Sequence, residues 1–184
     1  INGQHVEREW VPLTAMTKSL PRAVIGAEDA NFCRHSGFDL DAIQAAATAN
    51  SNGKKLRGGS TISQQTAKNA FLWPERSYVR KALEAWFTLL IEVVWGKPRI
   101  MEVYLNIVEM GPGIYGMEAA AEHYFGTSAD KLSARQAARL AAILPQPIKR
   151  SAVKPSKSVK RYARRIEKRV KVVRDEGIDS CLWR

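Results

Sequence analysis

Residues 77–94 read SYVRKALEAWFTLLIEVV. This stretch contains no glycine or proline and indicates a long α-helix. Ser77 is a favourable N-cap, and Gly96 and Pro98 end the stretch. Further helices, each bounded by a cap residue, a glycine or a proline, are expected at 19–27, 39–49, 99–107 and 134–144. No segment alternates convincingly as a strand would. The sequence therefore predicts an all-α fold in a single domain, residues 1–184.

Composition narrows the classes of function. The 184 residues are 45% hydrophobic and 26% charged, which is ordinary for a globular protein. Lys and Arg number 29 against 18 Asp and Glu, a net charge of +11 that favours an anionic partner such as nucleic acid, acidic lipid or a phosphorylated substrate. Two cysteines, Cys33 and Cys181, are too few for a disulfide framework, and their pairing stays open. No Cys and His run has metal-ligand spacing, and the most apolar run, 86–91, is too short to span a membrane.

The long helix carries a mixed-charge cluster. Arg80, Lys81 and Glu84 are three and four residues apart, so they share one helix face. Such a cluster is often a surface ion pair worth a few tenths of a kcal/mol. It is equally suited to holding a phosphate through its cations, with the carboxylate tuning them or placing a metal ion.

Residues 27–39 read AEDANFCRHSGFD and follow an apolar segment. A carboxylate beside apolar surface is a candidate general base, because desolvation raises its pKa toward working pH. Glu28 and Asp29 are the candidates, although an isolated pair of this kind is more typical of a solvated helix end.

Residues 54–65 read KKLRGGSTISQQ. The glycines allow close backbone approach, and hydroxyl and amide side chains follow them into a helix. A plain polar loop and a cradle for a phosphate or sugar are equally compatible with this segment.

Residues 154–174 contain ten basic side chains and one acidic one, Glu167. Apolar residues recur every three or four positions, which predicts an amphipathic helix packed on the core with a basic outer face. Adhesion of that face to anionic lipid is the alternative.

In order along the chain, these segments resemble the peptidoglycan glycosyltransferases that polymerise lipid II, the family of the glycosyltransferase domain of class A penicillin-binding proteins. The family motif Glu-Asp-x-x-Phe-x-x-His-x-Gly matches 28–37, Gly-Gly-Ser-Thr-Ile-x-Gln-Gln matches 58–65, and Arg-Lys-x-x-Glu matches 80–84. Two further motifs fall at 97–106 and 135–145. Because the chain lacks transpeptidase motifs, it is similar to the monofunctional type.

The resemblance implies a lysozyme-like fold with a globular head and a smaller membrane-facing lobe. It also implies a reaction: a growing glycan on polyprenyl pyrophosphate is transferred to the 4-hydroxyl of lipid II, with inversion to a β-1,4 linkage. Glu28 would be the base. The second catalytic carboxylate, Glu84, would position the cations Arg80 and Lys81 or help to hold a divalent metal, and Asp29 would orient its neighbours. Substrate contacts would come from Ser60, Thr61, Gln64, Gln65, Lys68 and Asn69.

The same resemblance implies a magnesium or manganese ion near Glu84 and no organic cofactor. It places the catalytic domain on the outer, periplasmic face of the bacterial inner membrane, beside cell-division or wall-synthesis proteins, with a family membrane helix missing from this stretch of sequence. The competing enzyme is a lytic transglycosylase or lysozyme, which cleaves glycan and has no use for a pyrophosphate site. A basic nucleic-acid-binding protein would explain the charge but not Glu28 or the Gly-Gly-Ser-Thr run, so no nucleic acid is expected as partner.

Overall fold

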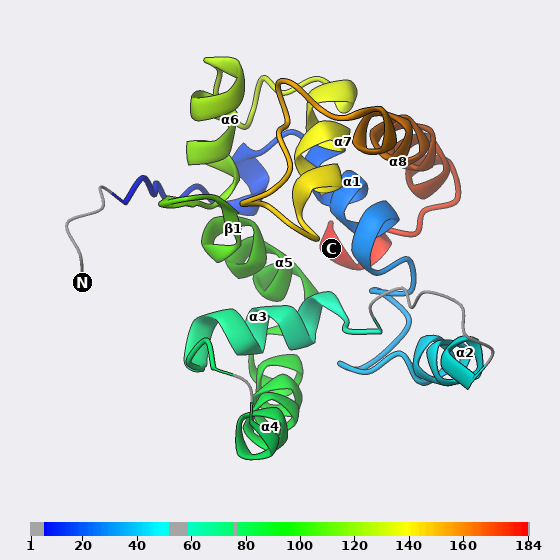
Figure 1. The fold of residues 1–184 in the computed structure, drawn as a ribbon. Coiled ribbons are helices and arrows are strands. Elements are labelled where there is room, and N and C mark those ends of the chain that lie inside the picture. The colour runs from blue at the N-terminus through cyan, green and yellow to red at the C-terminus, as the bar shows by residue number, and fades with distance from the viewer. Residues whose placement is uncertain (1–5, 52–58, 76, 184) are drawn as a thin grey trace.

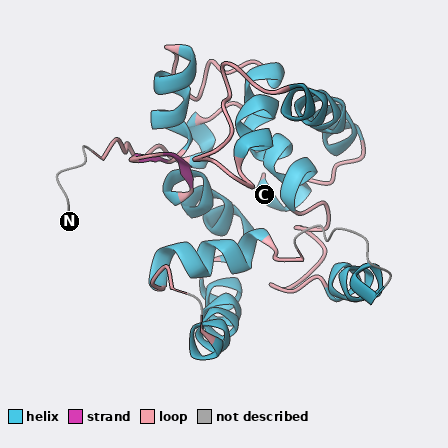
Figure 2. Cartoon of the chain, viewed as in Figure 1, coloured by secondary structure: helices cyan, strands magenta, loops and turns pink. Residues whose placement is uncertain are grey.

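The computed structural model describes residues 6–51, 59–75 and 77–183, and it confirms the all-α class (Figures 1 and 2). Each predicted helix is present, and within these described ranges only two very short strands accompany the helices. The α-helices are α1 (Ser19–Glu28), α2 (Leu40–Ser51), α3 (Ile62–Phe71), α4 (Tyr78–Val94), α5 (Gly96–Ile107), α6 (Met117–Phe125), α7 (Ala134–Ile143) and α8 (Lys157–Asp175). Two 3₁₀ turns, η1 (Leu13–Ala15) and η2 (Ser180–Leu182), and the strands β1 (Glu109–Gly111) and β2 (Ile114–Tyr115) complete the elements.

Two buried helices organise the core. Helix α5 buries Ile100, Met101 and the whole run 103–106, so it is enclosed on nearly every side. Helix α1 buries 20–21 and 23–26 and packs against α7 and α8. Burial of this much apolar surface is the main force that holds the larger lobe together. The smaller lobe consists of α3 and α4, and α3 packs back onto α5 (Figure 1).

The expectation of no strands was wrong at one place. Strands β1 and β2 form an antiparallel hairpin in which Glu109 pairs with Tyr115, and Glu7 adds a parallel bridge to Ile114. The strands have three and two residues, so no alternating pattern could develop in the sequence.

Helices α5 and α8 begin several residues away from their predicted starts. Helix α5 starts at Gly96 rather than at Arg99, because Pro98 lies in the first turn, where its missing N–H would have no helical partner anyway. Helix α8 starts at Lys157 rather than 154, since the Ser156 hydroxyl caps it by accepting from the Val159 N–H.

Helix α8 approaches α1 closely at Gly26. A Cβ on Gly26 would lie only 3.0 Å from the Cβ of Arg169, and the Arg169 guanidinium donates to the Gly26 carbonyl at 2.7 Å. The hydroxyl of Tyr162 donates to the next carbonyl, that of Ala27, at 3.1 Å. These bonds satisfy carbonyls of the last turn of α1 and fix the direction of the helix end, where Glu28 is the last residue.

A disulfide joins Cys33 to Cys181, which answers the question that the sequence left open. The two cysteines are 148 positions apart, and their Cα atoms are 5.6 Å apart. The bond attaches the loop after α1 to η2, near the end of the chain.

Within the described part of the chain, no helix has both the length and the hydropathy needed to cross a membrane.

Candidate active site

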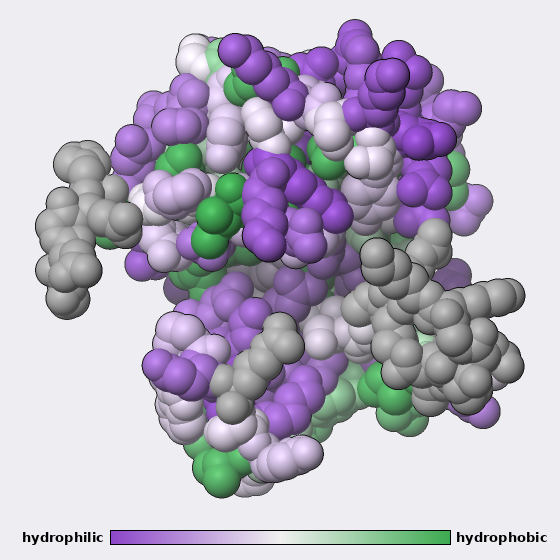
Figure 3. All heavy atoms as spheres, viewed as in Figure 1, coloured by the Kyte–Doolittle hydropathy of each residue, from purple (hydrophilic) through white to green (hydrophobic). Residues whose placement is uncertain are grey.

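A large cleft of about 1,930 Å³ lies between the two lobes. Its walls come from the end of α1, from α3 and α4, and from α8 with the loop that precedes it. Carboxylates and cations share these walls, and the hydrophilic surface continues into the hollow between the lobes in Figure 3.

Glu28 is the last residue of α1, and its side chain opens into the cleft. Its Oε2 accepts a hydrogen bond from the Gln65 side-chain amide at 3.1 Å. Burial raises the pKa of the Glu28 carboxyl above its usual value, and the neighbouring charge of Asp29 adds to the rise. The Gln65 hydrogen bond and the positive charge of Arg150 act in the opposite direction. A general base needs a pKa near the working pH, and the partial burial of Glu28 moves its pKa in that direction.

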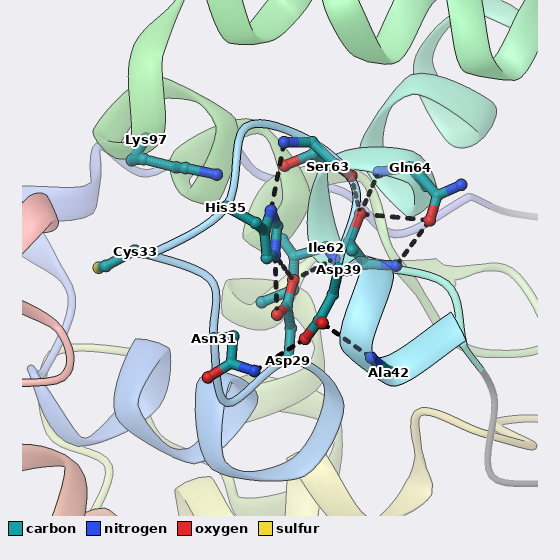
Figure 4. A network of polar contacts seen from close by, with 12 residues as sticks. Asp29, Asn31, Cys33, His35, Asp39, Ala42, Ile62, Ser63, Gln64 and Lys97 are labelled. Atoms are coloured by element: carbon teal, nitrogen blue, oxygen red, sulfur yellow. Dashed lines mark hydrogen bonds and ion pairs between the residues drawn. The ribbon is translucent and has the colours of Figure 1, made fainter. Parts of the chain in front are cut away.

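The carboxylate of Asp29 connects the first motif to the second (Figure 4). Its carboxylate accepts from the Ile62 backbone N–H at 2.9 Å, at the positive N-terminal end of α3. The same carboxylate lies 3.0 Å from Nε2 of His35. Because the Gly37 N–H donates to Nδ1 of His35, that ring carries its proton on Nε2 and donates it to Asp29. Asp29 and His35 therefore position the loop and α3.

The loop that follows depends on Gly37. Its φ of +95° is in the region that favours glycine, and a Cβ there would lie 2.8 Å from Cγ2 of Thr88. The carbonyl of Gly37 accepts from the Thr61 hydroxyl at 2.6 Å. The glycine of the first motif thus allows that loop to lie close against α4 while its carbonyl binds the residue that caps α3.

Helix α3 presents most of the second motif to the cleft. Thr61 and Gln64 form a capping box, in which each side chain accepts from the other residue's backbone N–H. The predicted contacts that line the cleft are Ser60, Gln64, Gln65, Lys68 and Asn69. Thr61 does not line it, because its hydroxyl is buried at the helix cap. Gly58 and the segment 54–57, with its basic residues Lys54, Lys55 and Arg57, lie outside the described residues.

The third motif forms the cationic wall on α4. Arg80 lies 3.3 Å from Oε2 of Glu84, and the Lys81 ammonium binds the other carboxylate oxygen of Glu84. Arg80 and Glu84 are buried, whereas the side chain of Lys81 remains about half exposed to the cleft. The Nε of Arg80 is buried with no hydrogen-bond partner among the described residues. The predicted shared face is therefore present, and Glu84 holds both cations.

Sequence reasoning missed three arginines on the opposite wall: Arg150 in the loop after α7, and Arg165 and Arg169 on α8. Arg150 donates a hydrogen bond to the Ala142 carbonyl at 2.8 Å. Its positive charge favours the ionised form of Glu28 and so opposes the rise of the Glu28 pKa. The spacing of four between Arg165 and Arg169 did indicate one helix face. It gave no sign that this part of the basic face borders the cleft rather than open solvent.

Among the described residues, no three His, Cys, Asp or Glu side chains come close enough together to hold a metal ion. Glu84, the expected ligand, forms ion pairs with Arg80 and Lys81.

Comparison with known proteins gives the same assignment over the whole length. Residues 1–175 match the family model described as "Transglycosylase". A curated biosynthetic peptidoglycan transglycosylase of Caulobacter vibrioides is 57% identical over 182 residues, covering 99% of this chain and 80% of that protein. Proteins of the same name from Rhodospirillum centenum (51% identical; 96% of this chain, 77% of that protein) and Shewanella oneidensis (54%; 90% and 71%) are also similar. The motif resemblance is confirmed: this chain belongs to the transglycosylase family.

Proposed function

We propose that this enzyme polymerises lipid II into glycan strands of peptidoglycan, forming β-1,4 linkages and releasing polyprenyl pyrophosphate. One observation carries the proposal: a carboxylate with a raised pKa, Glu28, lines the same cleft as the Arg80 and Lys81 cations. A base on one side and positive charge on the other is the arrangement that attack by a hydroxyl on a sugar pyrophosphate requires.

Glu28 acts on the nucleophile. A sugar hydroxyl is a poor nucleophile at neutral pH, so the Glu28 carboxylate takes the proton of the acceptor 4-hydroxyl as its oxygen attacks the anomeric carbon. The bond from that carbon to the pyrophosphate oxygen breaks with its electron pair, and the α-configured donor becomes a β-linked product. The proton then leaves Glu28 for solvent.

Arg80 and Lys81 act on the leaving group. Pyrophosphate departs as an anion, so fixed cations stabilise the developing charge without a proton donor. Glu84 holds both cations in place. The Nε–H of the same Arg80 guanidinium is buried and has no hydrogen-bond partner among the described residues. Lys68 on α3 lines the same cleft and adds positive charge.

A divalent cation is proposed to arrive with the substrate. Magnesium is commonly bound by one or two carboxylates together with substrate phosphates. Glu84 lies beside the proposed pyrophosphate position and would share its oxygens between the ion and its partners Arg80 and Lys81. Titration of chelated enzyme with magnesium or manganese tests this, because E84Q should need a higher metal concentration for half-maximal rate. An unchanged metal dependence in E84Q would remove Glu84 from the ligands.

We further propose that α4 meets the membrane surface on the periplasmic side. Its outer face exposes a set of large apolar side chains: Trp86, Leu89, Leu90, Val93 and Val94. Figure 3 shows apolar surface gathered at the outer end of this lobe, while hydrophilic side chains cover α8. The Cys33–Cys181 disulfide supports an oxidising compartment such as the periplasm.

The decisive experiment supplies lipid II in detergent or vesicles and sizes the products on a gel, in parallel with digestion of purified sacculi. The wild type should extend lipid II into long chains, and E28Q should fold but make none. Release of soluble fragments from sacculi, without chain synthesis, would instead indicate a lytic transglycosylase or lysozyme.

A further inference from the structure

Tyr104 is a polar side chain that the proposed reaction does not use. It lies on α5, is completely buried, and directs its hydroxyl at Oε1 of Gln65 over 3.3 Å. No other hydrogen bond of this hydroxyl is found among the described residues. A buried hydroxyl hydrogen without an acceptor is costly, so this contact has a preferred direction, from the phenol to the amide oxygen.

The orientation of the Gln65 amide determines which of its atoms faces Glu28. With its oxygen facing Tyr104, the amide presents Nε2–H to Oε2 of Glu28 at 3.1 Å. A reversed amide would place its oxygen against the carboxylate, a contact that is tolerable only when Glu28 is protonated. The orientation of Gln65 and the protonation of Glu28 are therefore coupled.

The phenol is suited to the donor role at every working pH. Burial raises the pKa of Tyr104 well above its usual value, and the charges of Glu28 and Asp29 raise it further. Tyr104 thus keeps its proton and does not exchange it with the base.

Other charges act on Glu28 from the elements around it. Asp29 follows it in the chain and is itself bound to His35, and Arg150 faces it from the loop after α7. The remaining charged groups that line the cleft are Lys68 on α3, Arg80, Lys81 and Glu84 on α4, Glu109 on β1, and Arg165 and Arg169 on α8. None of these is altered when the Tyr104 hydroxyl is removed.

We propose that Tyr104 is a positioning residue for the general base: it fixes the Gln65 amide so that its N–H faces Glu28 and keeps that carboxylate ready to accept a proton. The proposal rests on the assignment of Glu28 as base and extends it to a group that never touches substrate. It predicts a change in the pH dependence of the reaction, which a merely structural tyrosine would not produce.

The test is Tyr104→Phe, which removes one oxygen and keeps the ring. The rate of lipid II polymerisation is measured from acid to neutral pH. The midpoint of the acidic limb should move upward by roughly 0.5–1 pH unit, the size expected for the loss of one hydrogen bond to the carboxylate. At pH values well above that midpoint the rate should recover toward the wild-type value. Tyr124→Phe is the matched control, since it removes a hydroxyl that donates to the Met110 carbonyl and should leave the midpoint unchanged.

A second measurement does not depend on activity. The carboxyl carbon of Glu28 is titrated by NMR in the wild type, Y104F, Q65M and the double variant. Y104F and Q65M should both raise the Glu28 pKa, and Y104F should add nothing in the Q65M background, because both act through one amide. An unchanged Glu28 pKa in Y104F, or a uniform loss of rate at every pH, would overturn the proposal.

These results separate the two assignments. A Glu28 pKa that rises in Y104F, in an enzyme that does not polymerise lipid II, would uphold the role of Tyr104 and reject the proposed reaction. Should Y104F fail to fold, the Q65M titration alone decides whether the amide controls Glu28, and an unchanged pKa there refutes the chain of contacts.

Discussion

The Arg169 guanidinium donates to the carbonyl oxygen of Gly26 at 2.7 Å, and the two residues approach so closely that a Cβ on Gly26 would lie 3.0 Å from that of Arg169. Two residues after Gly26 comes Glu28, so the contact between α1 and α8 determines where the proposed base enters the cleft.

Gly26→Val should therefore separate α1 from α8. Overpacking of this kind costs about 1–3 kcal/mol of unfolding free energy, measured by urea denaturation. Ala82→Val on the exposed side of α4 is the control, because Ala82 is exposed and the change alters helix propensity by only a few tenths of a kcal/mol. Equal losses in the two variants would mean that α8 moves aside freely.

Glu28→Gln should make the protein more stable at neutral pH while abolishing the reaction. The folded-state pKa of Glu28 is raised, so the folded protein holds this proton more tightly than the unfolded chain does. Below the unfolded pKa both states are protonated and nothing is lost. As pH rises through the unfolded and then the folded pKa, the wild type loses stability that E28Q keeps. Denaturation at a series of pH values checks this, and a wild type that gains on E28Q with rising pH would contradict it.

Lys81→Ala should lower the rate of chain synthesis by roughly a hundredfold, the usual effect of removing one group that stabilises developing charge. Its side chain is half exposed, so the fold should tolerate the change. Lys131→Ala removes an exposed cation away from the cleft and serves as the control. Kinetics of K81A that match those of K131A would exclude Lys81 from the reaction.

Replacing both Cys33 and Cys181 by serine should lower the unfolding free energy by about 2–5 kcal/mol, because the bond closes a long loop in the unfolded chain. Thermal unfolding is measured with and without a reductant. The reductant should lower the melting temperature of the wild type and leave that of the double variant unchanged. A wild type that does not respond to reductant would show that the bond contributes nothing.

Removing apolar surface from α4 should weaken membrane binding. Val93 and Val94 are 85% and 73% exposed, and replacing both by serine should reduce binding to lipid vesicles about tenfold. Val172→Ser removes an exposed valine from α8 and should have little effect. Sedimentation with vesicles measures both, and equal binding by all variants would place the membrane contact elsewhere.

Most of the helices were predictable because their signals are local, although α6 was not among the predicted segments. Ser77 caps α4 as the sequence indicated, and Ser133 caps α7, whose predicted start is at residue 134. The shared face of Arg80, Lys81 and Glu84 follows from helical spacing alone. The β1–β2 hairpin was missed, since strands of two and three residues carry no periodic signal.

The parts of the site that depend on distant contacts were not predictable. Arg165 and Arg169 look like any solvated basic face, and only the packing of α8 on α1 brings them to the cleft. The hydroxyl of Thr61 is of the kind that contacts substrates. Because Thr61 is the N-cap of α3, however, its hydroxyl binds backbone at the start of that helix instead. Pairing of Cys33 with Cys181 requires knowledge of the whole fold.

That disulfide also changes what a protease could do to the molecule. It closes residues 33–181 into a covalent ring that holds the second and third motifs and the α8 arginines, while Glu28 and Asp29 lie just outside it on the N-terminal arm. A single backbone cut anywhere within the ring would leave both pieces attached to each other. Both halves of the proposed site would then stay on one molecule until the sulfur–sulfur bond itself was reduced.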